Sequence, residues 1–279
     1  MIEFAKETLS LLPFLFVTYL AIEAVEAKAG GALGRFLGRS RRIGPLAGAL
    51  AGVFPQCGFS AAAASLYAGG VVSAGTLLAV FLSTSDEMLP VLLSARLPLP
   101  SILEIVAFKT AGATAAGFAL DALLAAAGRG ERQASPGDLC EHSRCHCSTH
   151  KGIVVPALVH TLEIFIFIAV VSGAIELALN WFGEESLATL WLDKPFAGEL
   201  AGSALGLVPN CAVSAAAAKL YADGAISPGP LLASSFTGCG VGLLVLFRTN
   251  HNLKENLAVL AAIYTTGVVL GRLGALMFA

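Results

Sequence analysis

Two segments of this chain carry nearly the same sequence, one in each half. Residues 55–93 begin Pro-Gln-Cys-Gly-Phe-Ser, and residues 209–247 begin Pro-Asn-Cys-Ala-Val-Ser. Aligned without gaps, about half of the positions in these two segments are identical. Apolar helical composition alone produces some matches, but not a proline, an amide and a cysteine followed three residues later by a serine. The chain is therefore an internal duplication, and its fold must contain two related halves.

The composition predicts that the duplicated chain lies in a membrane. Hydrophobic residues make up 56% of it and charged residues only 13%, outside the range of soluble domains. No basic patch with interleaved aromatic residues is present, so nucleic acid is not an expected partner. The apolar stretches are each close to the ~20 residues that cross about 30 Å of hydrocarbon as helix. They are 8–26, 45–69, 73–95 and 100–127, then 156–180, 198–222, 228–248 and 255–277.

The charges of the loops predict that the two halves have opposite orientations. Residues 27–44 contain basic residues and no acid, and cytoplasmic loops are enriched in Lys and Arg. The matching loop of the second half, 181–197, is mainly acidic and is expected outside, whereas the basic loop 128–155 is expected inside. Equivalent loops on opposite sides indicate inverted repeats. The expected division is 1–127 for the first membrane repeat, 128–155 for the linker and 156–279 for the second repeat.

One stretch in each half is expected to enter and leave the membrane on the same side. The two basic loops are both expected in the cytoplasm, so the three segments between them must cross an even number of times. The stretch 45–69 is interrupted by Gly52, Pro55 and Gly58. Re-entrant backbone is tolerated only where it is buried in protein or lines a cavity. The predicted fold is all-α, with three crossings and one broken re-entrant hairpin per half, or ten helical pieces.

The same interruptions bring polar groups into apolar segments. Interrupted helices at corresponding positions of two halves are typical of the midplane binding site of a transporter. An amide, a thiol and a hydroxyl occur at each break, so the predicted site contains Gln56, Cys57 and Ser60 together with Asn210, Cys211 and Ser214. The alternative is that proline and small residues merely allow close helix packing.

The segment that follows differs between the halves. The first half contains Ser-Thr-Ser-Asp-Glu at 83–87, and the second half contains Ser-Phe-Thr-Gly-Cys-Gly at 235–240. A carboxylate inside a bilayer is costly and marks a functional site by default. The predicted substrate site therefore includes Thr84, Ser85, Asp86, Glu87, Thr237 and Cys239, with Asp86 and Glu87 as metal ligands. The alternative is a kink that leaves both acids in interfacial water. Lys109 is a candidate partner for a carboxylate such as Asp86.

The linker carries a second group of potential ligands. Thiolates and imidazoles at short spacing bind zinc or softer metals. The predicted metal-binding residues of the linker are Cys140, His142, Cys145, His146, Cys147 and His150. Their order does not match the two spaced pairs of a structural zinc finger, so a flexible capture site or sensor is the expected role. A polar linker enriched in these residues by chance is the alternative.

These motifs resemble a known family. The broken segment Pro-Gln-Cys-Gly-Phe-Ser-Ala at 55–61, the Ser-Thr-Ser-Asp-Glu segment that ends at Leu89-Pro90, and the Cys/His-rich loop before His160-Thr161-Leu162 are similar to the ten-helix heavy-metal exporters. Members of this prokaryotic family are described as arsenic efflux proteins or manganese transporters. The resemblance spans essentially the whole chain. It implies export of a metal or metalloid across the prokaryotic cytoplasmic membrane.

The expected function is secondary active transport rather than catalysis. No GxxxxGK[ST] phosphate-binding motif is present, and no cofactor is expected. Asp86 and Glu87 favour Mn²⁺ or a similar divalent ion exchanged for protons, since such ions prefer oxygen ligands. Arsenite or a soft metal would instead use the thiols of Cys57, Cys211 and Cys239. Oligomeric state, including a homo-oligomer, stays open.

Two alternatives come from other functional classes. An organic-anion carrier would use the N-termini of the half-helices, where backbone dipoles favour negative charge. An intramembrane enzyme would use Cys57 as nucleophile and His160 as base. The first would be expected to tolerate loss of the carboxylates, and the second would make a chemical product.

Overall fold

The part of the chain that the structure describes consists of helices joined by short connections. The structure is a computed structural model that describes residues 43–53, 57–85, 88–95, 97–128, 196–209 and 211–278, with a few single positions between 16 and 20 and between 154 and 170. All regular elements within these ranges are α-helices, and none of them is a strand. The all-helical prediction is confirmed for this part of the chain.

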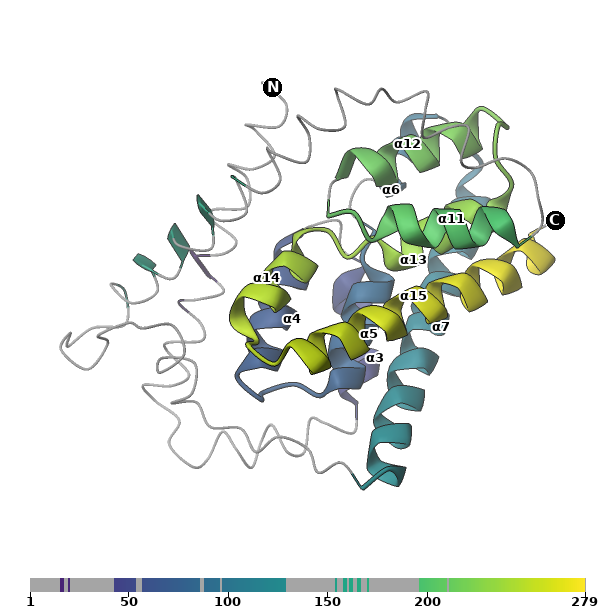
Figure 1. The fold of residues 1–279 in the computed structure, drawn as a ribbon. Coiled ribbons are helices and arrows are strands. Elements are labelled where there is room, and N and C mark those ends of the chain that lie inside the picture. The colour runs from purple at the N-terminus through teal and green to yellow at the C-terminus, as the bar shows by residue number, and fades with distance from the viewer. Residues whose placement is uncertain are drawn as a thin grey trace.

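The described helices fall into two sets that follow each other in the same order (Figure 1). The first set is α3 (Gly44–Gly52), α4 (Cys57–Ala68), α5 (Ala74–Ser83), α6 (Met88–Ser94) and α7 (Leu99–Ala126). The second set is α11 (Ala197–Gly206), α12 (Cys211–Ala222), α13 (Pro228–Thr237), α14 (Val241–Thr249) and α15 (Leu253–Met277). The duplicated sequence thus forms the same succession of helices twice, with α12 as long as α4 and α13 as long as α5.

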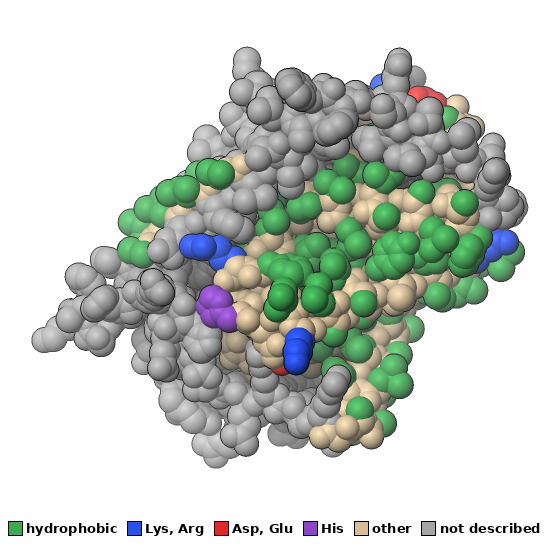
Figure 2. All heavy atoms as spheres, viewed as in Figure 1, with side chains coloured by type: hydrophobic (Ala, Val, Ile, Leu, Met, Phe, Trp, Pro, Cys, Tyr) green, Lys and Arg blue, Asp and Glu red, His purple; other side chains and the backbone are tan. Residues whose placement is uncertain are grey.

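Several of these helical stretches have the length and composition of membrane spans. Within the described ranges they are 74–94, which comprises α5 and α6, then α7, then 228–249, which comprises α13 and α14, and finally α15. The long helices α7 and α15 expose large apolar side chains such as Leu103 and Leu273. Figure 2 shows hydrophobic side chains gathered on the face that α15 crosses. Large exposed apolar surfaces of this kind mark contact with a membrane, so the chain has the character of a membrane protein.

Helices α5 and α13 form the centre. Every residue of 75–83 in α5 and of 229–237 in α13 is buried, as expected for helices that are apolar on all sides. Helix α5 packs against α3 and α7, α13 packs against α11 and α15, and the two central helices contact each other. The α3 and α11 contacts are close because Gly52 faces the Ser83 hydroxyl and Gly206 faces the Thr237 hydroxyl, where a Cβ has no room.

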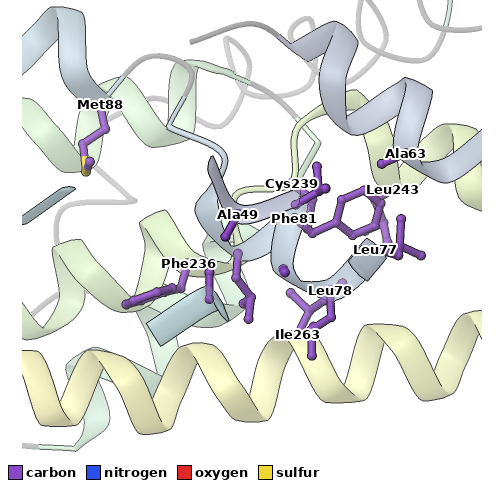
Figure 3. Close-up of a cluster of buried hydrophobic side chains, with 14 of the residues drawn as sticks. Ala49, Ala63, Leu77, Leu78, Phe81, Met88, Phe236, Cys239, Leu243 and Ile263 are labelled. Carbon is purple, nitrogen blue, oxygen red and sulfur yellow. The ribbon is translucent and has the colours of Figure 1, made fainter. Parts of the chain in front are cut away.

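The short helices α4, α6, α12 and α14 pack across the two halves. Helix α4 of the first half packs on α14 of the second, and α12 of the second half packs on α6 of the first. We call these two contacts the reciprocal contacts, because α4 corresponds to α12 and α6 corresponds to α14, so that each contact is the counterpart of the other with the halves exchanged. The hydrophobic core is therefore continuous between the halves, with Phe81, Phe236 and Ile263 among its fully buried members (Figure 3).

One pair of helix breaks was predicted from the sequence, and a second pair was not. The structure divides 45–69 into α3 and α4, and 198–222 into α11 and α12, as the sequence predicts. It also divides 73–95 into α5 and α6, and 228–248 into α13 and α14, which the sequence treats as continuous segments. The expected count of ten helical pieces is not confirmed, because the ranges 43–128 and 196–278 by themselves contain ten described helices, whereas the prediction assigned them eight. Most of 8–26 and 156–180, and all of the linker 128–155 beyond residue 128, lie outside the described residues.

Candidate functional site

Helix α5 ends in a cluster of buried hydroxyl groups. Its last turn has one main acceptor, the carbonyl of Val80, which accepts from the Thr84 backbone N–H at 3.1 Å and from the Thr84 Oγ1 at 2.7 Å. The Ser83 Oγ donates to the same carbonyl at 3.0 Å, and the Ser85 Oγ donates to the Ser83 carbonyl at 3.1 Å. Hydroxyls that bond to nearby carbonyls offer the backbone an alternative to helix continuation. The Ser-Thr-Ser sequence therefore supports a helix end here.

A lysine from another helix contacts this end. Lys109 lies within α7 and is only 1% exposed, and its Nζ donates to the Thr84 carbonyl and, at 3.0 Å, to the Ser85 Oγ. The final carbonyls of a helix have no intrahelical partner and carry the negative end of the helix dipole. The ammonium of Lys109 is favourably placed against both. It stabilises a helix end that the hydroxyls of 83–85 and Pro90, a residue tolerated only in the first turn of a helix, also favour.

The matching break of the second half is built differently. The Thr237 Oγ1 donates back to the Ala233 carbonyl at 3.0 Å, and the Cys239 Sγ donates to the Thr237 carbonyl at 3.0 Å. Gly240 then has φ 53°, a left-handed conformation that glycine adopts without strain, and α14 begins at the next residue. Cys239 is buried beside Phe81 and belongs to the apolar core (Figure 3). Among the described residues this break has hydroxyl and thiol groups but no ionisable cation, whereas Lys109 contacts the first.

The helix ends of the two halves lie close to one another. Ser60, in the first turn of α4, is fully buried, and a Cβ built on Gly242 at the start of α14 would lie 2.6 Å from the Ser60 Cβ. In the second half, a Cβ built on Gly238 would lie 3.1 Å from the Oγ of Ser214 in α12. The Ser235 Oγ donates to the Met88 Sδ at 3.1 Å, which joins α13 to the first residue of α6. The breaks therefore meet around the contact of α5 with α13.

The predicted site residues divide into those the structure places at these helix ends and those it does not describe. The side chains that it places there are Ser60, Thr84, Ser85, Ser214, Thr237 and Cys239. Gln56, Asp86, Glu87 and Asn210, the side chains of Cys57 and Cys211, and the linker residues Cys140, His142, Cys145, His146, Cys147 and His150 lie outside the described part. Among the described residues, no group of three or more His, Cys, Asp or Glu side chains could hold a metal ion.

Two carboxylates that the sequence analysis did not select lie at the opposite ends of the central helices. Asp121 of α7 accepts from the Gly75 N–H at 2.8 Å at the start of α5. Glu199 of α11 is 3% exposed, forms an ion pair of 3.3 Å with Arg272 of α15, and lies beside Gly229 at the start of α13. Negative charge is favourable at a helix N-terminus. The signal in the sequence was an acid inside an apolar stretch, the same signal that selected Asp86 and Glu87.

Comparison of the chain with protein-family models, with curated proteins and with solved structures finds no match.

Proposed function

We propose that this chain is a secondary transporter that exports a divalent metal ion, Mn²⁺ or a similar cation, in exchange for protons. The observation that carries the proposal is the meeting of interrupted helices from both halves at the contact between α5 and α13. Paired interruptions of this kind are how transporters place free backbone groups and polar side chains at the membrane midplane. A helix interruption that faced lipid would leave backbone N–H and C=O groups without hydrogen-bond partners. Inside the protein, side chains or a bound substrate can provide those partners.

Alternating access between two inverted repeats is the proposed mechanism. The charge difference between loops 27–44 and 181–197 supports opposite orientations of the halves in a prokaryotic cytoplasmic membrane. The reciprocal contacts of α4 with α14 and of α12 with α6 support a two-fold relation between the halves. In this proposal α3–α4 and α11–α12 are the two re-entrant hairpins, and the halves rock around the site where they meet.

The proposed ligands of the transported ion are oxygen atoms. Mn²⁺ prefers carboxylate, carbonyl and water oxygens. Asp86 and Glu87 follow directly after the hydroxyl cluster at the end of α5, which the structure places in the buried centre. The thiol of Cys239, the candidate ligand for a soft metal, donates to the Thr237 carbonyl two residues earlier and belongs to the apolar core. This placement supports oxygen ligands over a three-thiol site.

Transport by purified protein in liposomes tests the proposal. With Mn²⁺ on one side and a pH-sensitive dye on the other, the wild-type chain is expected to move Mn²⁺ in one direction and protons in the other. Asp86→Asn and Glu87→Gln should each reduce the initial rate by at least tenfold. Glu104→Gln is the matched control, since Glu104 is an exposed carboxylate on α7. Normal Mn²⁺ transport by both Asp86→Asn and Glu87→Gln would remove the carboxylate site, and transport of arsenite or Zn²⁺ in place of Mn²⁺ would transfer the site to the cysteines.

One observation favours a second candidate, an organic-anion carrier. The buried ammonium of Lys109 lies at the end of α5, and a buried cation is a natural partner for an anionic substrate. In that case liposomes should exchange carboxylate-containing anions, and transport should survive Asp86→Asn and Glu87→Gln but not Lys109→Met. The same liposomes therefore separate the two candidates.

A further inference from the structure

Two buried hydroxyl groups of the second half have no hydrogen-bond partner. Ser203 of α11 and Ser234 of α13 are fully buried. In the described part of the chain, their Oγ atoms are the only buried side-chain oxygen or nitrogen atoms that make no hydrogen bond. A hydroxyl buried in this way loses its hydrogen bonds to water and gains none in return. By contrast, Ser73 and Asp121 at the start of α5 bond to each other at 2.7 Å.

The two hydroxyls lie along the contact between α11 and α13, which we call the α11–α13 seam. Helices α11, α13 and α15 pack side by side (Figure 1). A Cβ built on Gly267 of α15 would lie 3.2 Å from the Ser203 Oγ, so this hydroxyl faces the junction of the three helices. A Cβ built on Gly206 of α11 would have no room beside the Ser234 carbonyl. Both serines therefore belong to a tightly closed helix contact.

The first half has apolar residues at the same two positions. Ala49 of α3 corresponds to Ser203, and Val80 of α5 corresponds to Ser234. Both are buried. The Val80 Cγ2 would lie 3.0 Å from a Cβ built on Gly48, so this side chain faces α3. The same framework of two helices is therefore closed by apolar contacts in the first half, whereas in the second half it contains two unsatisfied hydroxyls.

An ion pair lies at one end of the α11–α13 seam. Glu199 precedes Ser203 by four residues on α11, so the two side chains share a face of this helix. Its carboxylate is 3.3 Å from Arg272, which is 42% exposed near the end of α15. A long basic side chain at such a position carries its charge to the aqueous interface. The first half has Pro45 and Phe118 at these two positions. The ion pair thus marks the end of the seam that water reaches.

The other end of the α11–α13 seam reaches the buried helix breaks. Gly229 lies beside Glu199 at the start of α13, and Thr237 is the last residue of this helix. Eight residues of helix at about 1.5 Å each separate them by about 12 Å. The seam therefore extends from the ion pair to the place where the interrupted helices of the two halves meet.

We propose that the α11–α13 seam is an aqueous access route to these helix breaks, closed in this structure, that opens when α11 separates from α13. Its use by a transported cation rests on the proposed function, whereas its opening does not. Opening gives the hydroxyls of Ser203 and Ser234 the hydrogen bonds that the closed seam denies them. In the first half the same movement would expose Ala49 and Val80 to water, so that seam stays closed. Hydroxyl and carboxylate oxygens along the open seam suit a hydrated divalent cation.

Cysteine labelling in proteoliposomes tests the opening. Ser203→Cys and Ser234→Cys replace each hydroxyl with a thiol, and a charged, water-soluble methanethiosulfonate reagent modifies thiols that water reaches. Peptide mass spectrometry reads each position separately from the native cysteines. Ala49→Cys and Val80→Cys are the matched controls. We expect the initial labelling rate at positions 203 and 234 to exceed that at 49 and 80 by at least tenfold. Equal rates would overturn the access route and leave, at most, a fixed buried water at each hydroxyl.

A second comparison does not depend on the first-half variants. Ser234→Val gives the seam the residue that the first half has at this position. Added to Ser203→Cys, it should slow labelling at position 203 by at least tenfold, because the filled seam has less to gain from opening. Unchanged labelling would overturn the proposal.

Transport distinguishes failure of the route from failure of the proposed function. Ser203→Ala combined with Ser234→Val is expected to reduce the initial rate of Mn²⁺ transport in liposomes by at least tenfold. Transport at the wild-type rate would show that the cation does not use this seam. If the seam is labelled as expected but wild-type liposomes do not move Mn²⁺, the proposed function fails and the opening of the seam stands.

Discussion

The contact between Gly242 and Ser60 gives a direct prediction about how the two halves hold each other. Gly242 lies in the first turn of α14, and a Cβ at this position would lie 2.6 Å from the Cβ and 2.8 Å from the backbone carbonyl carbon of Ser60 in α4. It would also lie 2.8 Å from the ring of Phe81. Carbon atoms pack best at about 3.5–4.0 Å. Gly242→Ala therefore requires α4 and α14 to separate by about 1 Å, because rotation of a side chain does not move the Ser60 backbone.

The size of the effect follows from two opposing contributions. Overpacking a buried contact costs about 1–3 kcal/mol, and a rigid backbone neighbour places this case at the upper end. Alanine gains up to about 1 kcal/mol over glycine in a helix. The net loss is about 2 kcal/mol, which for a chain of this size corresponds to a fall of roughly 4–8 °C in Tm. Ser60→Gly in the same chain should recover part of this loss, since it removes the nearest atom but leaves the backbone.

The matched control is a glycine-to-alanine substitution at a position where the contacting atom belongs to a flexible side chain. A Cβ at Gly112 of α7 would meet the end of the flexible Leu270 side chain at 3.0 Å. Gly112→Ala should therefore leave the Tm unchanged or raise it slightly, because the gain in helix propensity outweighs a contact that a rotamer change relieves. Thermal unfolding of both variants in one detergent is the measurement. If Gly242→Ala unfolds within a degree of the wild type, the close contact between the halves at this point is refuted.

Two further substitutions test the core and the ion pair by the same measurement. Phe81→Ala removes a fully buried ring of the central helix α5 and should cost about 3–5 kcal/mol of stability. Leu103→Ala changes a side chain exposed on α7 and should alter the stability by less than about 0.5 kcal/mol. Similar Tm values for the two variants would contradict the central position of α5. Arg272→Ala removes the partner of the buried Glu199 carboxylate and should cost about 1–2 kcal/mol of stability. The loss is smaller than that from breaking a fully buried ion pair, because the arginine is 42% exposed. An unchanged Tm would contradict a stabilising role of this ion pair.

The sequence predicted most of what depends on local signals. A proline removes a backbone hydrogen-bond donor and disfavours helical conformation in the residue before it. The apolar stretches that contain Pro55 and Pro209 are accordingly each divided into two helices. The length and apolar character of α7 and α15 likewise follow from composition alone. The predicted inverted orientation, the metal ligands and the transport function stay predictions.

The sequence did not predict features that depend on contacts between distant residues. The break between α5 and α6 is one example, because the hydroxyls of 83–85 and Pro90 favour a helix end in this region but do not fix its position. Part of its stabilisation comes from Lys109, a residue that lies more than twenty positions further along the chain and reaches it only through the packing of α7 on α5. The charged pair of Glu199 and Arg272 is another example, because its partners lie on α11 and α15. Hydrophobic periodicity carries no information about such pairs.

The reciprocal contacts also bear on the origin of the chain. A single repeat would leave its α4 without the helix that covers it, because that helix belongs to the other half. Two copies of such a repeat would cover each other by exchanging α4, as in a swapped homodimer, and joining them would preserve every contact. We expect a chain cut within the linker to copurify as two bound fragments, and either fragment made alone to be degraded or to associate with itself.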